Sequence, residues 1–246
     1  MEAKENGGGV QPRGTDVNLR SGPQMLEYRA IAERIAADGV ARILDWGCGY
    51  GQVSDLLFRQ GIEVTSFDYR PDAEEGVLAL ERYPDLKVHV SRDPRRLPFA
   101  DAAFEAVLSC GVLEHVEDPD ASLEEVRRVL IPGGRLYVYK LPNRASYLEA
   151  IAKRAGLYYH GALEHDRIYT RRSALALLDR HGFAVEEFRR MNMLPLTVTG
   201  SVAARAAEAI WAANRALSAV PGLNLFATNL ELVAQAPGGL RPGLAR

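Results

Sequence analysis

An α/β domain with a mainly parallel sheet is the fold class that the sequence predicts, and the order of its elements is the first reason. Apolar, strand-like runs alternate with helical segments up to residue 141, as in parallel strands joined by right-handed crossovers. The second reason is a glycine turn, GCGYG at 47–51, directly after the apolar run at 41–46. Glycine permits positive φ and lacks the Cβ that would keep a ligand away from the main chain. We therefore expect a ligand at the carboxyl end of the first strand.

The elements can be placed in order along the chain. Helical spacing and start or stop signals predict helices at 23–38, 51–60, 71–83, 118–130, 146–155, 171–181 and 201–219. Strands are predicted at 41–46, 62–68, 86–90, 104–110, 135–141, 183–188 and 225–235. An irregular stretch at 156–169 and a loop at 191–199 complete the pattern. The connection between the last two strands is long for a hairpin, so we expect it to shape a substrate site.

Composition limits the function classes. The chain has 246 residues, enough for one α/β domain with a large core, and a formal net charge of −2, so no nucleic-acid partner is expected. Two cysteines cannot build a disulfide framework or a four-thiolate zinc site, and we predict no metal. We expect a domain at 21–236, with substrate-shaping segments at 142–170 and 191–224 and flexible tails at 1–20 and 237–246.

The N-terminal segment is polar and lacks the apolar core of a signal peptide, and no run of eighteen apolar residues is present. These observations predict a cytoplasmic protein without stable membrane insertion, either a monomer or a homodimer.

The residues around the glycine turn indicate which cofactor binds there. The second strand ends at Asp68, about twenty residues after the turn, which is the spacing that lets a carboxylate reach a ribose diol. Asp45 lies two residues before the first glycine of the turn, and a carboxylate there repels a pyrophosphate but attracts an ammonium or sulfonium group. The dinucleotide fingerprint also has its third glycine one position later. S-adenosylmethionine, which carries both cations and no phosphate, is therefore the cofactor that we expect.

With an acid followed by G-x-G-x-G, the chain resembles the class I S-adenosylmethionine-dependent methyltransferases. The stretch from Arg92 to Asn143 is similar to the central block of that family: an acid after strand three, then LPF, strand four, LEHV and a helix ending in RVL-x-PGG. The resemblance covers Leu26 to Asn143 most strongly. It implies a Rossmann-like, doubly wound sheet of seven strands in the order 3-2-1-4-5-7-6, with strand seven antiparallel and helices on both faces.

The resemblance also implies a set of cofactor-binding residues. It places Asp45 at the amino group, Gly47 and Gly49 under the methionine part, Asp68 at the ribose hydroxyls, Tyr69 over the adenine, Asp93 at the adenine amino group, and Cys48, Pro94, Cys110 and Gly111 in the surrounding wall. The alternatives are a structural tight turn at the glycines, a helix N-cap at Asp68, a turn residue at Asp93, and a redox or metal pair of cysteines. Pro94 departs from the family, because proline has no N–H to donate to the adenine.

Two histidines are candidates for catalysis. His115, in LEHV, could act as a general base or could orient its loop by hydrogen bonds. His165 lies with His160 and three tyrosines in the irregular stretch, which could line a substrate pocket or could be a capped loop. A hydroxyl acceptor would benefit from such a base, whereas an electron-rich carbon needs less help.

We expect methyl transfer to a small, partly hydrophobic metabolite, on oxygen or carbon. Adaptable apolar residues in the insertion favour such an acceptor, although they could be core only: Met191, Met193, Leu194, Ile210 and Trp211. Two other interpretations remain open. One is a module that binds S-adenosylmethionine without catalysis or acts on a protein, and the other is a nucleotide-dependent oxidoreductase of the Rossmann type.

Overall fold

A single mixed sheet organises the protein. The computed structural model describes residues 21–69, 83–93, 95–156, 166–198 and 200–238. The strands are β1 (Arg42–Trp46), β2 (Glu63–Tyr69), β3 (Lys87–Ser91), β4 (Phe104–Cys110), β5 (Leu130–Pro142), β6 (Ala184–Met191) and β7 (Asn229–Gln235). Their order is β3-β2-β1-β4-β5-β7-β6, and only β7 is antiparallel to its neighbours, which confirms the expected topology.

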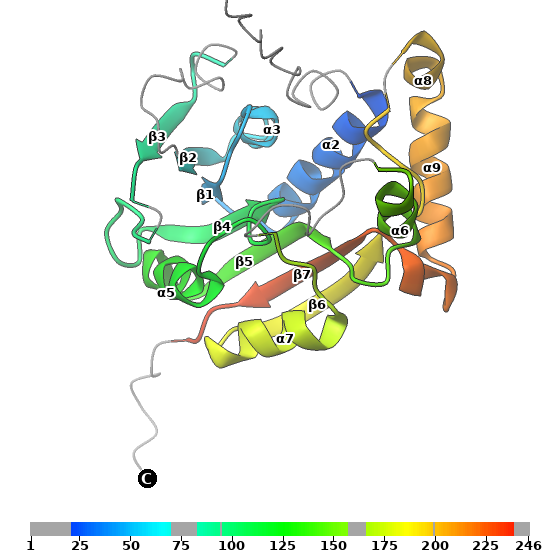
Figure 1. The fold of residues 1–246 in the computed structure, drawn as a ribbon. Helices are drawn as coiled ribbons and strands as arrows, with labels where there is room; N and C mark the ends of the chain where they lie inside the picture. Colours follow the sequence, from blue (N-terminus) through cyan, green and yellow to red (C-terminus); the bar gives the residue numbers. More distant parts are fainter. Residues whose placement is uncertain (1–20, 70–82, 94, 157–165, 199, 239–246) are drawn as a thin grey trace, which may run out of the picture.

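Helices cover both faces of this sheet (Figure 1). The helices are α2 (Gly22–Ala37), α3 (Gln52–Arg59), α5 (Pro119–Val129), α6 (Tyr147–Arg154), α7 (Arg171–Arg180), α8 (Ser201–Arg205), α9 (Ala207–Ser218) and the 3₁₀ helix η1 (Leu223–Phe226). On one face, α2 and α3 bury Ile35 and Leu57 against β1, β2 and β4. On the other face, α5 and α7 bury Leu123 and Leu178. The strands are apolar on both sides because each face is covered.

Four boundaries differ from the sequence prediction. β5 begins at Leu130, which leaves α5 in an extended conformation and pairs with Phe104 before the strand becomes regular. β6 continues to Met191, and β7 begins only at Asn229, because residues 223–226 form η1 with Phe226 half exposed. The helix expected at 201–219 is broken at Ala206 into α8 and α9. The predicted helix 71–83 falls almost entirely outside the described residues. The predicted tail at 1–20 lies wholly outside them, and so does the predicted tail at 237–246 except for residues 237 and 238.

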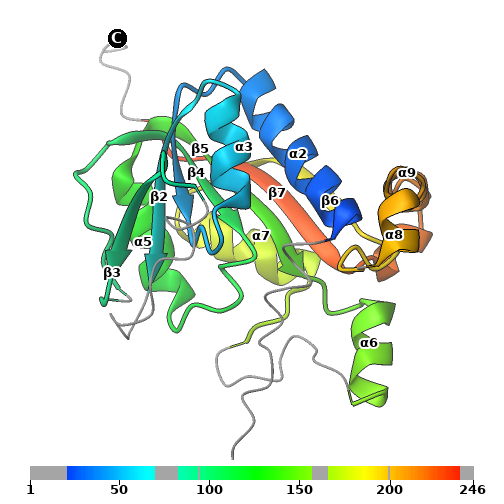
Figure 2. The ribbon, with the colours of Figure 1, turned by 90° about the horizontal axis from the view of Figure 1, so that it is seen from above.

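The helices α6, α8 and α9 gather at the end of the sheet where β5 finishes and β7 begins (Figures 1 and 2). Both α8 and α9 contact α2. The approach is close at Gly22, where an added Cβ would lie 3.0 Å from the Cβ of Ala207. One of the two segments expected to shape the substrate site, that at 191–224, therefore packs against α2.

Candidate functional site

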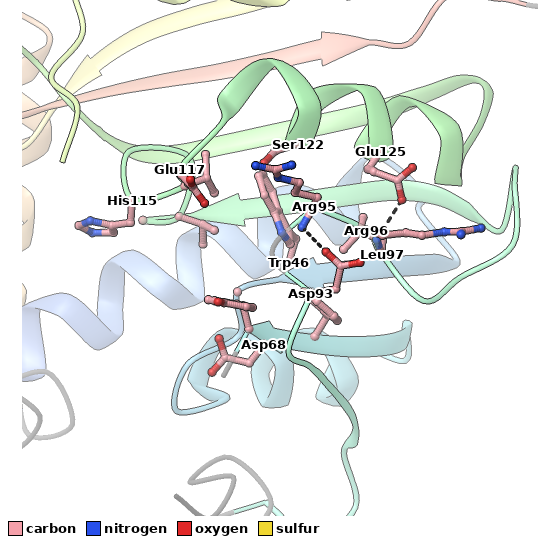
Figure 3. Close-up of a pocket in the computed structure, with 16 residues that line it drawn as sticks. Trp46, Asp68, Asp93, Arg95, Arg96, Leu97, His115, Glu117, Ser122 and Glu125 are labelled. Atoms are coloured by element: carbon pink, nitrogen blue, oxygen red, sulfur yellow. Dashed lines mark hydrogen bonds between the residues drawn. The ribbon is translucent and has the colours of Figure 1, made fainter. Parts of the chain in front are cut away.

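A cavity of about 390 Å³ opens at the carboxyl ends of β1, β2 and β4 (Figure 3). This is the edge where ligands bind in open α/β sheets. Its walls come from the glycine turn, the ends of β2 and β3, the loop after β4 and helix α5. The lining residues are Trp46, Gly47, Phe67, Asp68, Tyr69, Asp93, Arg95, Arg96, Leu97, Gly111, Val112, His115, Val116, Glu117, Ser122 and Glu125.

The glycine turn forms the floor of this cavity. Gly47 has φ of 78°, and its N–H donates to the carbonyl oxygen of Phe67 at 2.8 Å. A Cβ at this position would lie 2.4 Å from Cγ2 of Val112, in the loop after β4. Any residue with a side chain would therefore clash with that loop as well as strain the backbone. The turn needs glycine for close packing as well as for backbone conformation.

Asp45 lies just behind the turn and is almost fully buried. The Ser54 hydroxyl donates to its Oδ2 at 2.5 Å, and the Ser66 hydroxyl donates to Ser54 Oγ at 2.8 Å. Burial raises the pKa of Asp45 to about 6, although the Ser54 hydrogen bond acts in the opposite direction. Among the described residues no cation forms an ion pair with this carboxylate. A buried carboxylate in this state suits a ligand that brings its own positive charge.

Three predicted cofactor residues, Asp68, Tyr69 and Asp93, line the cavity together. Asp68 lies near the end of β2, and Asp93 follows β3, the neighbouring strand (Figure 3). Asp93 accepts the backbone N–H of Arg95 at 2.9 Å, so it forms the local turn that its alternative interpretation proposed. That bond engages one of its two oxygens and leaves capacity for a ligand. Pro94 lies outside the described residues, as does the segment in which Asp68 could cap a helix.

Four predicted cofactor residues do not line the cavity itself: Asp45, Cys48, Gly49 and Cys110. Neither cysteine forms a disulfide in the described structure, and Cys48 is buried. Burial raises the pKa of the Cys110 thiol well above its ordinary value, so this thiol is not activated as a nucleophile. The described part of the chain contains no group of three or more His, Cys, Asp and Glu side chains able to hold a metal. Gly111, which follows Cys110, does line the cavity.

His115 lies at the wall of the cavity and contacts a distant segment of the chain. Its Nδ1 is 2.8 Å from Oδ1 of Asp166, whose side chain is almost fully buried. The next residue, Arg167, donates to the carbonyl oxygens of Val116 and Glu117. The segment that begins at Asp166 is therefore fixed onto the LEHV loop. His165, the other predicted catalytic residue, lies outside the described residues.

Several wall residues were not among the predicted site residues, and Trp46 is the most informative of them. Along β1, Asp45 points toward α3, so the alternation of a strand sends Trp46 to the opposite face, where it reaches the cavity. That alternation could have identified Trp46 from the sequence. The alternation of a strand does not apply to the other wall residues. Arg95 and Arg96 lie in a loop, and Glu125 lies in helix α5.

Comparison with known proteins agrees with this geometry. A family model described as a methyltransferase domain matches residues 44–138. An ubiquinone biosynthesis O-methyltransferase of Xanthomonas campestris pv. campestris (strain B100) is 31% identical over 191 residues, which cover 70% of this chain and 77% of that protein. A protein of the same name from Xylella fastidiosa (strain M23) is 37% identical over 122 residues, 47% of each chain. The chain thus spans about half the length of this second relative.

One solved structure has a similar fold, the 1,6-didemethyltoxoflavin-N1-methyltransferase of Burkholderia thailandensis with bound 1,6-didemethyltoxoflavin and S-adenosylhomocysteine. The TM-score is 0.56 at 20% identity, over 91% of this chain and 82% of that one.

The strand order, the glycine turn and the acids at the ends of β1 and β2 define a Rossmann-like fold of the methyltransferase type. The chain belongs to the class I S-adenosylmethionine-dependent methyltransferases. Within the described ranges, no helix combines the length and apolar character that crossing a bilayer requires.

Proposed function

We propose that this protein transfers a methyl group from S-adenosylmethionine to a small, partly hydrophobic metabolite, most simply to a hydroxyl oxygen. The observation that carries the proposal is Asp45, a buried carboxylate without an ion-pair partner in the described chain, just behind the glycine turn of a cavity that Asp68 lines. This arrangement fits a ligand with a cationic end and a ribose, and it disfavours a pyrophosphate. The names of the relatives support oxygen as the acceptor atom, with carbon as the alternative.

In this proposal the cofactor spans the cavity from the glycine turn to β3. Asp45 holds the amino group, the turn at Gly47 and Gly49 lies under the methionine part, and Asp68 accepts hydrogen bonds from the ribose hydroxyls. Tyr69, Asp93 and the stretch around Pro94 serve the adenine, and the wall beside the sulfur is formed by Cys48, Cys110 and Gly111. When bound, the cofactor supplies a reactive methyl group, so the protein needs mainly to align the acceptor and exclude water.

His115 is the base in this proposal, and Asp166 orients it. A carboxylate 2.8 Å from Nδ1 favours the proton on that nitrogen, which makes Nε2 the nitrogen that takes the acceptor's proton. Nε2 lies 3.8 Å from Oε1 of Glu114. Because His115 lines the cavity, its ring can reach an acceptor hydroxyl that approaches the methyl group. His165 remains a second candidate from the sequence.

The acceptor would enter from the side of β5 and β7, because the loops after β1, β2 and β3 serve the cofactor. The segments 142–170 and 191–224 border that side. Met193 is buried and belongs to the core, whereas Met191, Leu194, Ile210 and Trp211 are half buried and could contact an apolar acceptor. We further propose that the protein is a cytosolic monomer or homodimer. Its formal net charge of −2 supports the absence of a nucleic-acid partner.

The test is methyl transfer from S-adenosylmethionine carrying an isotopic methyl label, with a metabolite extract and separately a protein extract as acceptor. Label in a small-molecule fraction supports the proposal. Label in protein alone would support the protein-directed alternative, and cofactor binding without any transfer would support the non-catalytic one. Binding of NAD in place of the labelled cofactor would support the oxidoreductase.

A further inference from the structure

A buried charged cluster lies beside the proposed acceptor entrance and is not used by the cofactor site. Its centre is the Nζ of Lys140, near the end of β5, 3.5 Å from Oε2 of Glu27 on α2. The side chain of Glu27 is 2% exposed, and that of Lys140 is 21% exposed. Lys140 Nζ also lies 5.0 Å from the centroid of the Tyr28 ring. Burying such charges is costly, and Oε2 of Glu27 accepts no hydrogen bond within the described chain, so the pair invites a functional explanation.

The backbone is distorted in order to place this lysine. Along β5, Leu136 and Val138 face the core under α5 and α7, whereas Tyr137 and Tyr139 face α2 and α3. Strict alternation would send Lys140 into the first of these cores. Instead Lys140 has φ of 61°, the pairing with β7 shifts between Val138 and Leu141, and the side chain turns toward α2. Irregularities of this kind redirect side chains beside active sites.

A second left-handed residue converges on the same carboxylate. Asn192, directly after β6, has φ of 72°, and its Nδ2 donates to Oε1 of Glu27 at 2.5 Å. Lys140 and Asn192 are two of the three non-glycine residues with positive φ in the described chain. Asparagine adopts this left-handed conformation readily, whereas lysine does so at a cost, so Lys140 in particular is kept here at the expense of stability.

The cluster lies next to the cofactor cavity. The N–H of Gly111, which lines that cavity, donates to the carbonyl oxygen of Tyr139 at 3.1 Å, and Lys140 is the next residue. Cys110 lies between the two sites, and its pKa is lowered by the charge of Lys140 and raised by that of Asp45. The ammonium is therefore on the α2 side of the sheet edge, where an acceptor would approach the sulfonium.

The ammonium keeps its charge and has hydrogen-bonding capacity left. Burial lowers the pKa of Lys140, but the negative charge of Glu27, together with smaller effects that include a hydrogen bond with Tyr28, outweighs burial and raises this pKa above its ordinary value. A lysine has three N–H donors, and in the part of the chain that the structure describes its ion-pair and ring contacts are Glu27 and Tyr28. One donor thus remains for a group that enters at the sheet edge.

We propose that Lys140, held by Glu27 and Tyr28, binds the ionised hydroxyl of the acceptor and so favours phenols over neutral alcohols. This inference rests on the proposed methyl transfer to oxygen, for which it supplies the charge opposite the developing oxyanion. A proton leaves the hydroxyl to His115 or to water, the oxygen forms a bond to the methyl carbon, and the carbon–sulfur bond breaks with its electron pair on sulfur. The oxyanion and the sulfonium neutralise each other in the transfer, so the part of the ammonium is to stabilise the ionised oxygen before the methyl group moves.

The test uses 4-nitrocatechol, whose phenolate absorbs at longer wavelength than its phenol, in the presence of saturating S-adenosylhomocysteine. In the parent protein the absorbance titration of the bound probe should have a midpoint at least about one pH unit below that of the free probe, a tenfold stronger acid. Lys140→Met should abolish this shift, and Lys140→Arg should retain it. Both replacements are unbranched at Cβ, so they carry a similar backbone cost. Lys87→Met, at an exposed lysine 3.8 Å from Glu63, should behave as the parent.

Three outcomes would each overturn this inference. The parent protein could bind no probe, it could bind the probe without shifting its midpoint, or the Lys140→Met variant could keep the shift. If Lys140→Met does not fold, the parent and Lys140→Arg measurements still decide the matter. Calorimetric titration with S-adenosylhomocysteine alone separates this result from the proposed function. Normal cofactor affinity with no phenolate shift removes the role of Lys140 only, whereas absent cofactor affinity removes the proposed function itself.

Discussion

His115 and Asp166 are 51 positions apart in the sequence, yet their side chains meet at 2.8 Å between Nδ1 and Oδ1. The histidine belongs to the loop after β4, and the aspartate belongs to the segment that follows α6. Arg167 fixes the same two segments together through the carbonyl oxygens of Val116 and Glu117. The cavity wall and the segment that borders the acceptor side are therefore joined at the residue best suited to remove a proton.

His115→Gln should lower kcat by about 10²–10⁴-fold on a hydroxyl acceptor, because a general base contributes that much, while the affinity for S-adenosylhomocysteine stays unchanged. Asp166→Asn should lower kcat less and alter the pH–rate profile, because the carboxylate that orients the ring is lost. The control is His181→Gln, since His181 is 2.8 Å from Asp120 and away from the cavity. That variant should lose stability and keep kcat. A His115→Gln enzyme with the parent's pH–rate profile would refute the role of base.

Asp68→Ala should weaken S-adenosylhomocysteine binding at least about tenfold, because each charge-assisted hydrogen bond is worth roughly 1.5–3 kcal/mol. Isothermal titration calorimetry measures this directly. Asp85→Ala, at an exposed position before β3, is the matched control and should bind as the parent does. Equal affinity in the two variants would reject the ribose role of Asp68.

The affinity for S-adenosylhomocysteine should fall as the pH drops below about 6. Asp45 takes up a proton near this pH in the free protein, and the ligand's ammonium requires the carboxylate to be ionised. The loss should approach tenfold per pH unit well below the pKa. Asp45→Asn should bind weakly, with little dependence on pH between 5 and 8. A parent affinity that is constant over that range would contradict this role of Asp45.

The same carboxylate should destabilise the free protein at neutral pH. The pKa of Asp45 is about 6 in the folded chain, above the ordinary 3.8, so its ionisation makes stability fall as the pH rises from about 4 to about 6. Without ligand, Asp45→Asn should therefore melt at a higher temperature than the parent at pH 8 and lose that advantage near pH 4. The opposite order of melting temperatures at pH 8 would show that the buried charge carries no such penalty.

Gly47→Ala should cost more stability than Gly61→Ala, although both glycines have φ near 80°. The conformational penalty of about 1–2 kcal/mol is shared, but only the new Cβ at position 47 meets a neighbour, Cγ2 of Val112 at 2.4 Å. Position 61 has open space around it. Denaturant unfolding measures the difference, and adding Val112→Ala should recover most of the excess. Equal costs at the two glycines would mean that the Val112 contact does not constrain the turn.

The first part of the sheet could be predicted from the sequence because β1, β2 and β4 are apolar runs that end in or beside a glycine turn or an acid. Strand seven was placed too early, since Leu225 and Phe226 have strand-like composition but form an exposed 3₁₀ turn. The acids at the ends of β1 and β2 could also be predicted. Each stands at a fixed place in the motif, at the carboxyl end of its strand and therefore at the sheet edge.

The rest of the site depends on contacts between distant segments. Nothing in the local pattern around His115 indicates Asp166, and nothing around Lys140 indicates Glu27, because both pairs form only when the loop or helix packs on the sheet. The turn of Lys140 toward α2 is also invisible in the sequence, since strand alternation points the other way. Side chains placed by a bulge or a long-range contact escape rules that use spacing alone.

The central claim is that the cavity binds S-adenosylmethionine, and the most direct test is calorimetric titration of the parent protein with S-adenosylhomocysteine and, separately, with NAD. The account predicts saturable binding of one S-adenosylhomocysteine per chain and no heat of binding with NAD, because Asp45 favours an ammonium and repels a pyrophosphate. Saturable binding of NAD with none of S-adenosylhomocysteine would contradict it.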